Sequence, residues 1–314
     1  MKIVIAEPIG LSEQMRNEYN STFADHGHKI EFFDTVPENE QECIQRCRNA
    51  EIVVISTYMM TSSLLSELPS LKMIAVAFTG YDHVDIEYCR ENGISVSNAA
   101  GYSTTAVAEQ TVLMILSLIR NAREMESKCR ALKGREGYLG KELEGMKVGI
   151  IGYGLIGQKT AQLLTAFGCE ILLAERNTIT ESSHKQLPLD ELLAEADIIS
   201  LHIPMTAENE MLINSTAISK MKNSALIINT ARGGVVDSEA LADALNSGKI
   251  SGAAIDIFEV EPPLPATHPL LNAKNCMIMP HTAYATVEAM EKRSDIVLKN
   301  IVSWLIGKGG NVIA

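Results

Sequence analysis

The strongest constraint on the fold is a glycine-rich turn between an apolar run and a helical pattern. Val148–Ile151 is continuously apolar and leads into G-x-G-x-x-G at Gly152, Gly154 and Gly157. Apolar residues then recur at helical spacing over 155–167. A buried strand that turns at once into a helix leaves free N–H groups facing the turn, and these favour a pyrophosphate. The motif predicts a dinucleotide site, although alone it is weak evidence.

The composition excludes several classes of protein. The 314 residues are 46% hydrophobic, enough for two domains with large cores. A net charge of −12 argues against a nucleic-acid or anionic-membrane partner. No apolar run approaches the roughly 18 residues of a membrane span, and no signal peptide is evident. Six scattered cysteines without C-x-x-C indicate reduced thiols, and His26 and His28 lack a partner metal motif. We expect a cytoplasmic protein without a metal site.

Short apolar runs alternate with helix-compatible segments twice along the chain. The first set of candidate strands is Lys2–Ala6, Lys29–Phe33, Ile52–Ile55, Met73–Ala77 and Ile94–Val96. The second set is Lys147–Ile151, Glu170–Ala174, Ile198–Leu201, Ala225–Asn229, Gly252–Ile257 and Cys276–Met279. This alternation predicts an α/β fold with parallel sheets and helices on both faces. Six strands in the second half suit a doubly wound dinucleotide fold.

The small-residue segment Asn98–Thr104 interrupts this alternation, and we expect the chain to cross there into a second domain. The dense apolar spacing of Thr105–Glu124 predicts one long, well-buried helix. A last helical pattern, Val287–Ile306, cannot be assigned to either domain from its spacing.

Glu175 directly follows the predicted strand Glu170–Ala174, 18 residues after Gly157. In a dinucleotide fold, an acid about 20 positions on accepts hydrogen bonds from the ribose hydroxyls. Its charge would also repel a 2′-phosphate, which favours NAD over NADP. Arg176 could instead hold that phosphate, so NADP stays the less favoured alternative.

Three polar residues, Arg232, Glu261 and His281, follow predicted strands of the second half. Each alone is ordinary, because loop arginines and glutamates are usually solvated and a lone histidine is usually structural. Glu259 could equally be solvated. However, the carboxyl ends of parallel strands share one edge of the sheet, where ligands bind. We therefore expect the three residues to lie together.

The order of these motifs resembles the D-isomer-specific 2-hydroxyacid dehydrogenase family over essentially the whole chain. The matching segments are Val148–Gly157, Ser200–Thr206, Asn229–Gly234, Asp256–Pro262 and Pro280–Ala283. The resemblance implies two doubly wound domains. A Rossmann NAD-binding domain (99–282) would be inserted into a flavodoxin-like substrate domain (1–98 plus 283–314). It also implies a homodimer joined in part by the long helix and the loop before the glycine turn.

The resemblance implies a role for each polar residue. Arg232 would clamp the substrate carboxylate, because a planar guanidinium fork suits that group. His281 would be the general acid in reduction and the base in oxidation. Glu261 would hydrogen-bond the other ring nitrogen, fix the tautomer and raise the pKa of the histidine.

The supporting contacts also follow from the resemblance. The cofactor would contact Gly152, Gly154, Leu155, Ile156, Gly157, Glu175, Arg176, Thr105, His202, Pro204, Thr230, Ala231, Asp256 and Ala283. Among these, Asp256 would approach the nicotinamide amide and Thr105 the phosphates. The substrate would contact Arg232, His281 and the loop of Thr79, Gly80 and Tyr81.

The segment His281–Thr286 resembles the glycerate dehydrogenase (hydroxypyruvate reductase) branch, which usually has tryptophan where this chain has Tyr284. We therefore expect an NAD-dependent oxidoreductase for a small D-2-hydroxyacid and its 2-oxoacid, with hydroxypyruvate or glyoxylate reduction first. Because Tyr284 departs from the branch, phosphoglycerate and D-lactate-type dehydrogenases stay open. An NAD(H)-sensing protein like the family's corepressor branch is the non-enzyme alternative, since it keeps the same motifs.

Overall fold

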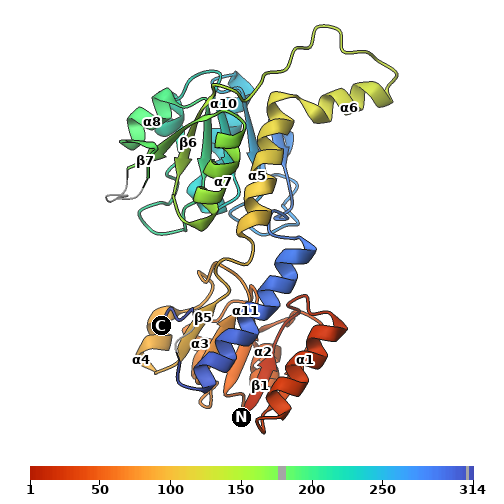
Figure 1. The fold of residues 1–314 in the computed structure, drawn as a ribbon, viewed down its shortest axis with the longest axis vertical. Coiled ribbons are helices and arrows are strands. Elements are labelled where there is room, and N and C mark those ends of the chain that lie inside the picture. Colours follow the sequence, from red (N-terminus) through yellow and green to blue (C-terminus); the bar gives the residue numbers. More distant parts are fainter. Residues whose placement is uncertain (176–181, 309–310) are drawn as a thin grey trace. The chain divides into compact units, whose positions relative to one another are not determined.

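The computed structural model describes residues 1–175, 182–308 and 311–314. They form two compact units, Met1–Ser103 with Ala285–Ala314 (unit 1) and Thr104–Tyr284 (unit 2). Each unit is built on its own parallel sheet with helices packed against it (Figure 1). In the described ranges, none of the helices has both the length and the apolar character that a bilayer crossing requires.

Unit 1 contains a five-stranded sheet in the order β2-β1-β3-β4-β5, the flavodoxin-like arrangement. Its strands are β1 (Lys2–Ile5), β2 (Lys29–Phe32), β3 (Ile52–Ile55), β4 (Met73–Val76) and β5 (Ser95–Asn98). Its helices are α1 (Glu13–Ala24), α2 (Glu40–Cys47), α3 (Ser62–Ser66), α4 (Ile86–Glu91) and α11 (Val287–Leu305). The end of the chain lies along β5, because the Val96 N–H donates to the Ala314 carbonyl (2.9 Å).

Unit 2 contains a seven-stranded sheet in the order β12-β11-β10-β9-β6-β7-β8. Its strands are β6 (Lys147–Ile151), β7 (Glu170–Ala174), β8 (Lys185–Leu187), β9 (Ile198–Leu201), β10 (Leu226–Asn229), β11 (Gly252–Ile255) and β12 (Cys276–Ile278). Its helices are α5 (Thr104–Ile119), α6 (Ala122–Arg130), α7 (Leu155–Ala166), α8 (Leu189–Glu195), α9 (Ser215–Lys220) and α10 (Ser238–Ser247), with 3-10 turns η1 (Gly233–Val235) and η2 (Pro269–Asn272). The strand order reverses between β6 and β9, where a doubly wound sheet binds its ligand.

Both faces of the unit 2 sheet are covered by apolar helix surfaces. Ile115 of α5 and Leu164 of α7 belong to the core on one face. On the other face, Leu192, Ile218 and Leu241 of α8, α9 and α10 belong to a second core. Strands β9 and β10 are buried along their whole length, as expected for central parallel strands.

The predicted α/β fold with two parallel sheets is confirmed, and each predicted strand is present with its ends within two residues. The sheet of unit 2 has seven strands rather than six. The missed strand, β8, lies at the sheet edge and has three residues, of which only Leu187 is buried. Such a short edge strand produces no periodic pattern.

The prediction of one helix over Thr105–Glu124 is wrong, because α5 ends at Ile119 and α6 begins after Asn121. Asn121 adopts a left-handed conformation with φ of 46°, which ends the helix. The Ile119 carbonyl accepts a hydrogen bond from the Lys141 N–H (3.0 Å) instead of one from a further helical turn.

Candidate active site

The glycine-rich turn joins β6 to α7 at the carboxyl edge of the unit 2 sheet. Gly152 has φ of +99°, and a Cβ there would lie 2.6 Å from the His202 carbonyl carbon. A Cβ at Gly157 would overlap the Gly152 carbonyl oxygen, so this glycine lets α7 pack against the turn. At Gly154, an added Cβ would meet no atom within 4 Å, so the backbone is open to approach. The turn therefore fits a pyrophosphate at the start of a helix.

A cavity of about 580 Å³ lies at the carboxyl ends of β6, β7 and β9. The predicted residues that line it are Gly152, Gly154, Glu175, His202 and Pro204. Residues that the sequence did not suggest also line it, among them Tyr153, Glu208, Asn209 and Leu212. The last three follow Thr206, beyond the end of the motif Ser200–Thr206. The size is typical of small-molecule sites, and the cavity lies where the strand order reverses.

The edges of this cavity hold further predicted residues. Glu175 is exposed directly after β7, whereas Arg176 lies outside the described residues. Leu155 and Ile156 form the first turn of α7, whose backbone N–H groups have no partners within the helix. These N–H groups and the helix dipole favour an anion beside the turn.

His202 follows β9 and lines the cavity with an uncharged ring. Its Nε2 lies 2.9 Å from the hydroxyl oxygen of the buried Ser200. Burial lowers the pKa of His202 to about 4, so the ring is neutral at pH 7. His202 can therefore contribute shape and hydrogen bonding, but no positive charge, to a bound phosphate. Ser200 lies within a motif but was not predicted, because a serine in an apolar strand has many structural explanations.

His281 and Glu261 form an acid–histidine pair at the same edge of the sheet. The two carboxylate oxygens of Glu261 lie 3.0 and 2.9 Å from His281 Nδ1. This hydrogen bond is the main cause that lowers the pKa of the Glu261 carboxyl, and the charge of Arg232 acts in the same direction. A carboxylate at Nδ1 fixes the tautomer, so Nε2 is the nitrogen that can exchange a proton with a bound molecule. The Tyr284 ring meets the His281 ring edge-on at 5.2 Å.

Asp256 positions the segment that carries His281. One oxygen of its buried carboxylate accepts the Thr282 N–H (2.9 Å), and the other accepts the Ala283 N–H (2.9 Å). The Asp256 carbonyl accepts the His281 N–H (2.7 Å). These bonds hold His281 in a left-handed conformation with φ of 55°, which a non-glycine residue rarely adopts. Asp256 and Ala283, predicted as cofactor contacts, are thus joined to each other in the structure.

Arg232 is positioned by its neighbours in the loop after β10. The buried Asn229 side chain accepts the Ala231 N–H (3.0 Å) and donates to the Arg232 carbonyl (2.9 Å). A Cβ at Gly233 would overlap the Phe258 backbone, so glycine lets this loop contact the segment after β11. This segment carries Glu261, whose carboxyl pKa the Arg232 charge helps to lower.

The structure gives the neighbouring Glu259 a partner of its own. Glu259 Oε1 lies 3.0 Å from Nε2 of the buried His268. His268 Nδ1 accepts the Leu270 N–H (3.3 Å), so the proton of the ring is on Nε2 and is donated to Glu259. Glu259 therefore holds a structural histidine, and Glu261 is the glutamate paired with His281.

The structure gives the local surroundings of the remaining predicted residues within each unit. Thr230 Oγ1 lies 3.1 Å from the hydroxyl of Thr111, which ties the end of β10 to α5. Thr105 is exposed in the first turn of α5. The loop Thr79–Tyr81 follows β4 in unit 1, where the Asn98 side chain donates to the Thr79 carbonyl (2.7 Å).

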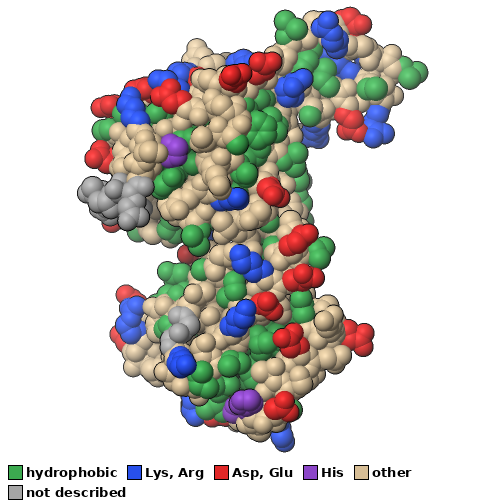
Figure 2. Space-filling model, viewed as in Figure 1, with side chains coloured by type: hydrophobic (Ala, Val, Ile, Leu, Met, Phe, Trp, Pro, Cys, Tyr) green, Lys and Arg blue, Asp and Glu red, His purple; other side chains and the backbone are tan. Residues whose placement is uncertain are grey.

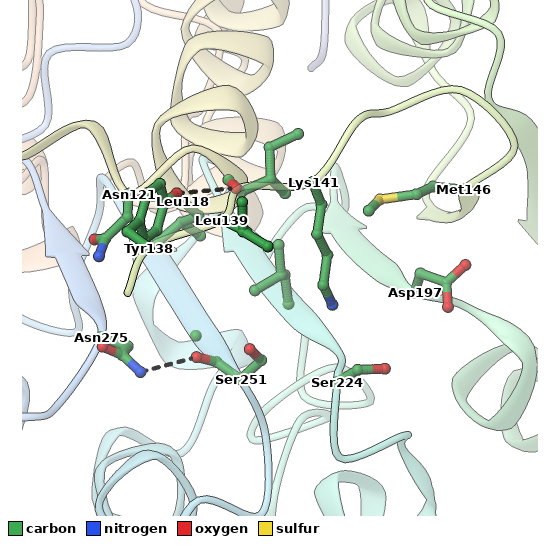
Figure 3. A pocket seen from close by; sticks show the side chains of 13 residues that line it. Leu118, Asn121, Tyr138, Leu139, Lys141, Met146, Asp197, Ser224, Ser251 and Asn275 are labelled. Atoms are coloured by element: carbon green, nitrogen blue, oxygen red, sulfur yellow. Dashed lines mark hydrogen bonds between the residues drawn. The ribbon is translucent and has the colours of Figure 1, made fainter. Parts of the chain in front are cut away.

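A second cavity of about 250 Å³ lies at the opposite, amino edge of the unit 2 sheet (Figure 3). Residues that precede strands line it, including Met146, Asp197 and Ser251. The Asp197 carboxylate accepts the Lys147 N–H (2.9 Å) and a proton of Lys222 Nζ (2.7 Å), so its charge is balanced within the fold. Because doubly wound sheets bind ligands at the carboxyl edge, the first cavity is the candidate site for the cofactor.

Known proteins similar to this chain include reductases of 2-oxoacids and related enzymes. The sequence model for the NAD-binding domain of D-isomer-specific 2-hydroxyacid dehydrogenases matches residues 112–283. A glyoxylate reductase from Thermofilum pendens is 37% identical over 87% of this chain and 83% of its own length. A hydroxypyruvate reductase from Blautia hydrogenotrophica is 34% identical over 87% and 88%. Among solved structures, an acyclic imino acid reductase in complex with NADPH and D-arginine has a TM-score of 0.92 and 30% identity, with 100% of both chains covered.

Proposed function

We propose that this chain, which belongs to the D-isomer-specific 2-hydroxyacid dehydrogenase family, reduces hydroxypyruvate or glyoxylate with NADH. Membership makes it an NAD-binding oxidoreductase that acts on CH–OH donors, and the particular substrate is the proposed part. The names of the two relatives support these oxoacids. The observation that carries the proposal is the pair of His281 and Glu261 beside Arg232, at the carboxyl edge of the sheet with the glycine turn.

The polar residues suit proton transfer to a 2-oxo group. Arg232 would bind the substrate carboxylate through its planar fork and so orient the 2-oxo group. When bound, a reduced nicotinamide supplies a hydride to the 2-oxo carbon. His281 would give the proton on Nε2 to the 2-oxo oxygen, which completes the hydroxyl group. Glu261 would accept the Nδ1 proton in a hydrogen bond throughout and keep the ring oriented. In oxidation, His281 takes the hydroxyl proton back.

NAD is the proposed cofactor in preference to NADP. Glu175 lines the cavity with Gly152 and Gly154. There its carboxylate would accept the ribose hydroxyls and repel a 2′-phosphate. The matching family model is that of an NAD-binding domain, whereas the similar imino acid reductase holds NADPH. The preference in this chain therefore rests on Glu175.

The two units would divide the work between cofactor and substrate. Unit 2 would be the dinucleotide-binding domain, because it contains the glycine turn and the cavity beside it. Unit 1 would be the substrate domain, in which backbone N–H groups of Thr79–Tyr81 help bind the substrate carboxylate. This loop follows β4 at the carboxyl edge of its sheet, where such sheets bind ligands.

A homodimer would use the segment of α6 and the loop after it, residues 122–142. This arm projects from the rest of unit 2, and α6 has no buried residue (Figures 1 and 2). Leu132 and Leu139 of the arm are 97% and 87% exposed. An isolated nine-residue helix is marginal in water, so a partner surface would stabilise it.

Light scattering tests the role of this arm, and it should show that Leu132→Asp lowers the mass to that of a monomer. The control Val36→Asp, at an exposed apolar site in unit 1, should keep the mass of a dimer. A dimeric Leu132→Asp would contradict the proposed role of the arm.

A panel of 2-oxoacids tests the proposed substrate. NADH oxidation is measured with hydroxypyruvate, glyoxylate, pyruvate and phosphohydroxypyruvate, and kcat/KM should be highest for one of the first two. A preference for pyruvate would indicate a D-lactate-type enzyme, and a preference for phosphohydroxypyruvate a phosphoglycerate dehydrogenase. NADH binding without turnover of any of them would favour an NAD(H) sensor.

A further inference from the structure

A buried arginine of unit 1, Arg293, has no carboxylate partner among the described residues. Arg293 lies in the first half of α11 and is 5% exposed. Within the described part of the chain, its guanidinium makes one hydrogen bond, from Nη2 to the Ile9 carbonyl (2.6 Å), and no ion pair. Its buried Nε–H donates to no described residue. Removing a guanidinium from water without a counter-charge is costly, so this arrangement needs an explanation.

The guanidinium lies at the carboxyl edge of the unit 1 sheet. Ile9 follows β1, and Tyr102, whose ring centroid is 5.7 Å from Arg293 Cζ, follows β5. Gly10 has φ of +71°, and a Cβ there would lie 3.1 Å from Nη2, so glycine leaves room for the guanidinium. The strand order reverses at β1 and β3. Open α/β sheets bind ligands outside the carboxyl ends of such strands.

One aromatic contact connects this guanidinium to the proposed substrate loop. The ring of Tyr102 packs against that of Phe78, with centroids 6.0 Å apart. Phe78 immediately precedes the loop Thr79–Tyr81, and its carbonyl accepts the Ala99 N–H (3.0 Å). Arg293 and the substrate loop are therefore joined through two packed rings at one edge of unit 1.

We propose that Arg293 is the cation of an anion subsite in unit 1 and takes the second acidic group of a 2-oxoacid or 2-hydroxyacid. A guanidinium forms charge-assisted hydrogen bonds with carboxylate and phosphate alike, and burial strengthens them. The role of this subsite in catalysis rests on the proposed function. The affinity of unit 1 for an anion does not, and it can be measured separately. Substrates with two acidic groups should therefore bind more tightly than substrates with one.

Steady-state kinetics of charge variants test the subsite. Arg293→Met keeps a long side chain and removes the charge, and Arg90→Met makes the same change at an exposed site of unit 1. In Arg293→Met, the KM for oxaloacetate or phosphohydroxypyruvate should rise on the order of 10- to 100-fold, and that for hydroxypyruvate should not change. Arg90→Met should match the wild type. An equal change in KM for all substrates, or none, would overturn the proposal. If Arg293→Met does not fold, Arg293→Lys replaces it, because it keeps the charge but loses the fork and should raise the same KM selectively.

A binding measurement separates this proposal from the proposed function. Malonate and inorganic phosphate should each raise the melting temperature of the wild type and of Arg90→Met, but not that of Arg293→Met, because a bound anion stabilises the folded state. If malonate alone stabilises the protein, the subsite binds a second carboxylate. If phosphate alone stabilises it, the subsite binds a phosphate ester. If the anions stabilise the wild type but not Arg293→Met, and the wild type reduces none of the 2-oxoacids, the subsite is supported and the proposed reaction is refuted. Equal stabilisation of Arg293→Met and the wild type would refute the subsite.

Discussion

Asp256→Asn should loosen the segment that carries His281. The Asp256 carboxylate accepts the N–H groups of Thr282 and Ala283, each at 2.9 Å. An asparagine keeps the shape, but its NH₂ group cannot accept, so one buried N–H loses its acceptor and faces a second donor. Loss of a hydrogen bond to a charged group costs about 1–3 kcal/mol in the free energy of unfolding. Because His281 adopts φ of 55° only while this segment is held, a shift of roughly 1 Å should lower kcat by up to about 100-fold.

The assay has a thermodynamic and a kinetic part. Urea unfolding gives the change in the free energy of unfolding, and NADH oxidation with hydroxypyruvate gives kcat. The matched control is Asp243→Asn on the exposed face of α10, which should change stability by less than about 0.5 kcal/mol. If Asp256→Asn were as stable and as active as this control, the hydrogen bonds of Asp256 would not position His281.

Two further substitutions test the cofactor cavity. Glu175→Ala should raise the KM for NADH far more than the KM for NADPH, because the ribose hydroxyls lose their acceptor; equal effects in NADH and NADPH kinetics would overturn the assignment. Burial holds the pKa of His202 at about 4, below its unfolded value of about 6.5. As pH falls through this window the unfolded state takes up the proton first, so stability falls. In the wild type, the free energy of unfolding should fall by up to about 3 kcal/mol between pH 6.5 and 4 because of His202, and in His202→Asn this part of the fall should be absent. Urea unfolding at several pH values measures it, and the same pH dependence in both proteins would contradict the prediction.

Much of the fold could be predicted because its signals are local and periodic. The buried central strands, such as Ile198–Leu201, are continuous apolar runs, and the glycine turn combines a strand, a tight turn and a helix within ten residues. The strand-end positions of Arg232, Glu261 and His281 followed from the same alternation. The roles proposed for these residues stay predictions until they are tested.

Other features depend on contacts that spacing does not record. The end of α5 at Ile119 depends on a left-handed Asn121 and on a hydrogen bond from a residue about 20 positions further on. The partner of Glu259 is His268, a buried residue of a different segment that no sequence pattern singled out. The helical pattern around Arg293 does not predict its contacts with Ile9 and Tyr102, which the structure shows. In each case the decisive contact lies outside the short apolar patterns from which the fold was predicted.

His281 tests the proposed reaction most directly. Its replacement by alanine removes the proton donor and leaves the glycine turn and Glu175 intact. With hydroxypyruvate as substrate, kcat of His281→Ala should fall by about 10²- to 10⁴-fold, while the Kd for NADH, measured by fluorescence titration, stays at the wild-type value. Near-normal turnover in this variant would contradict the role of His281 as the proton donor.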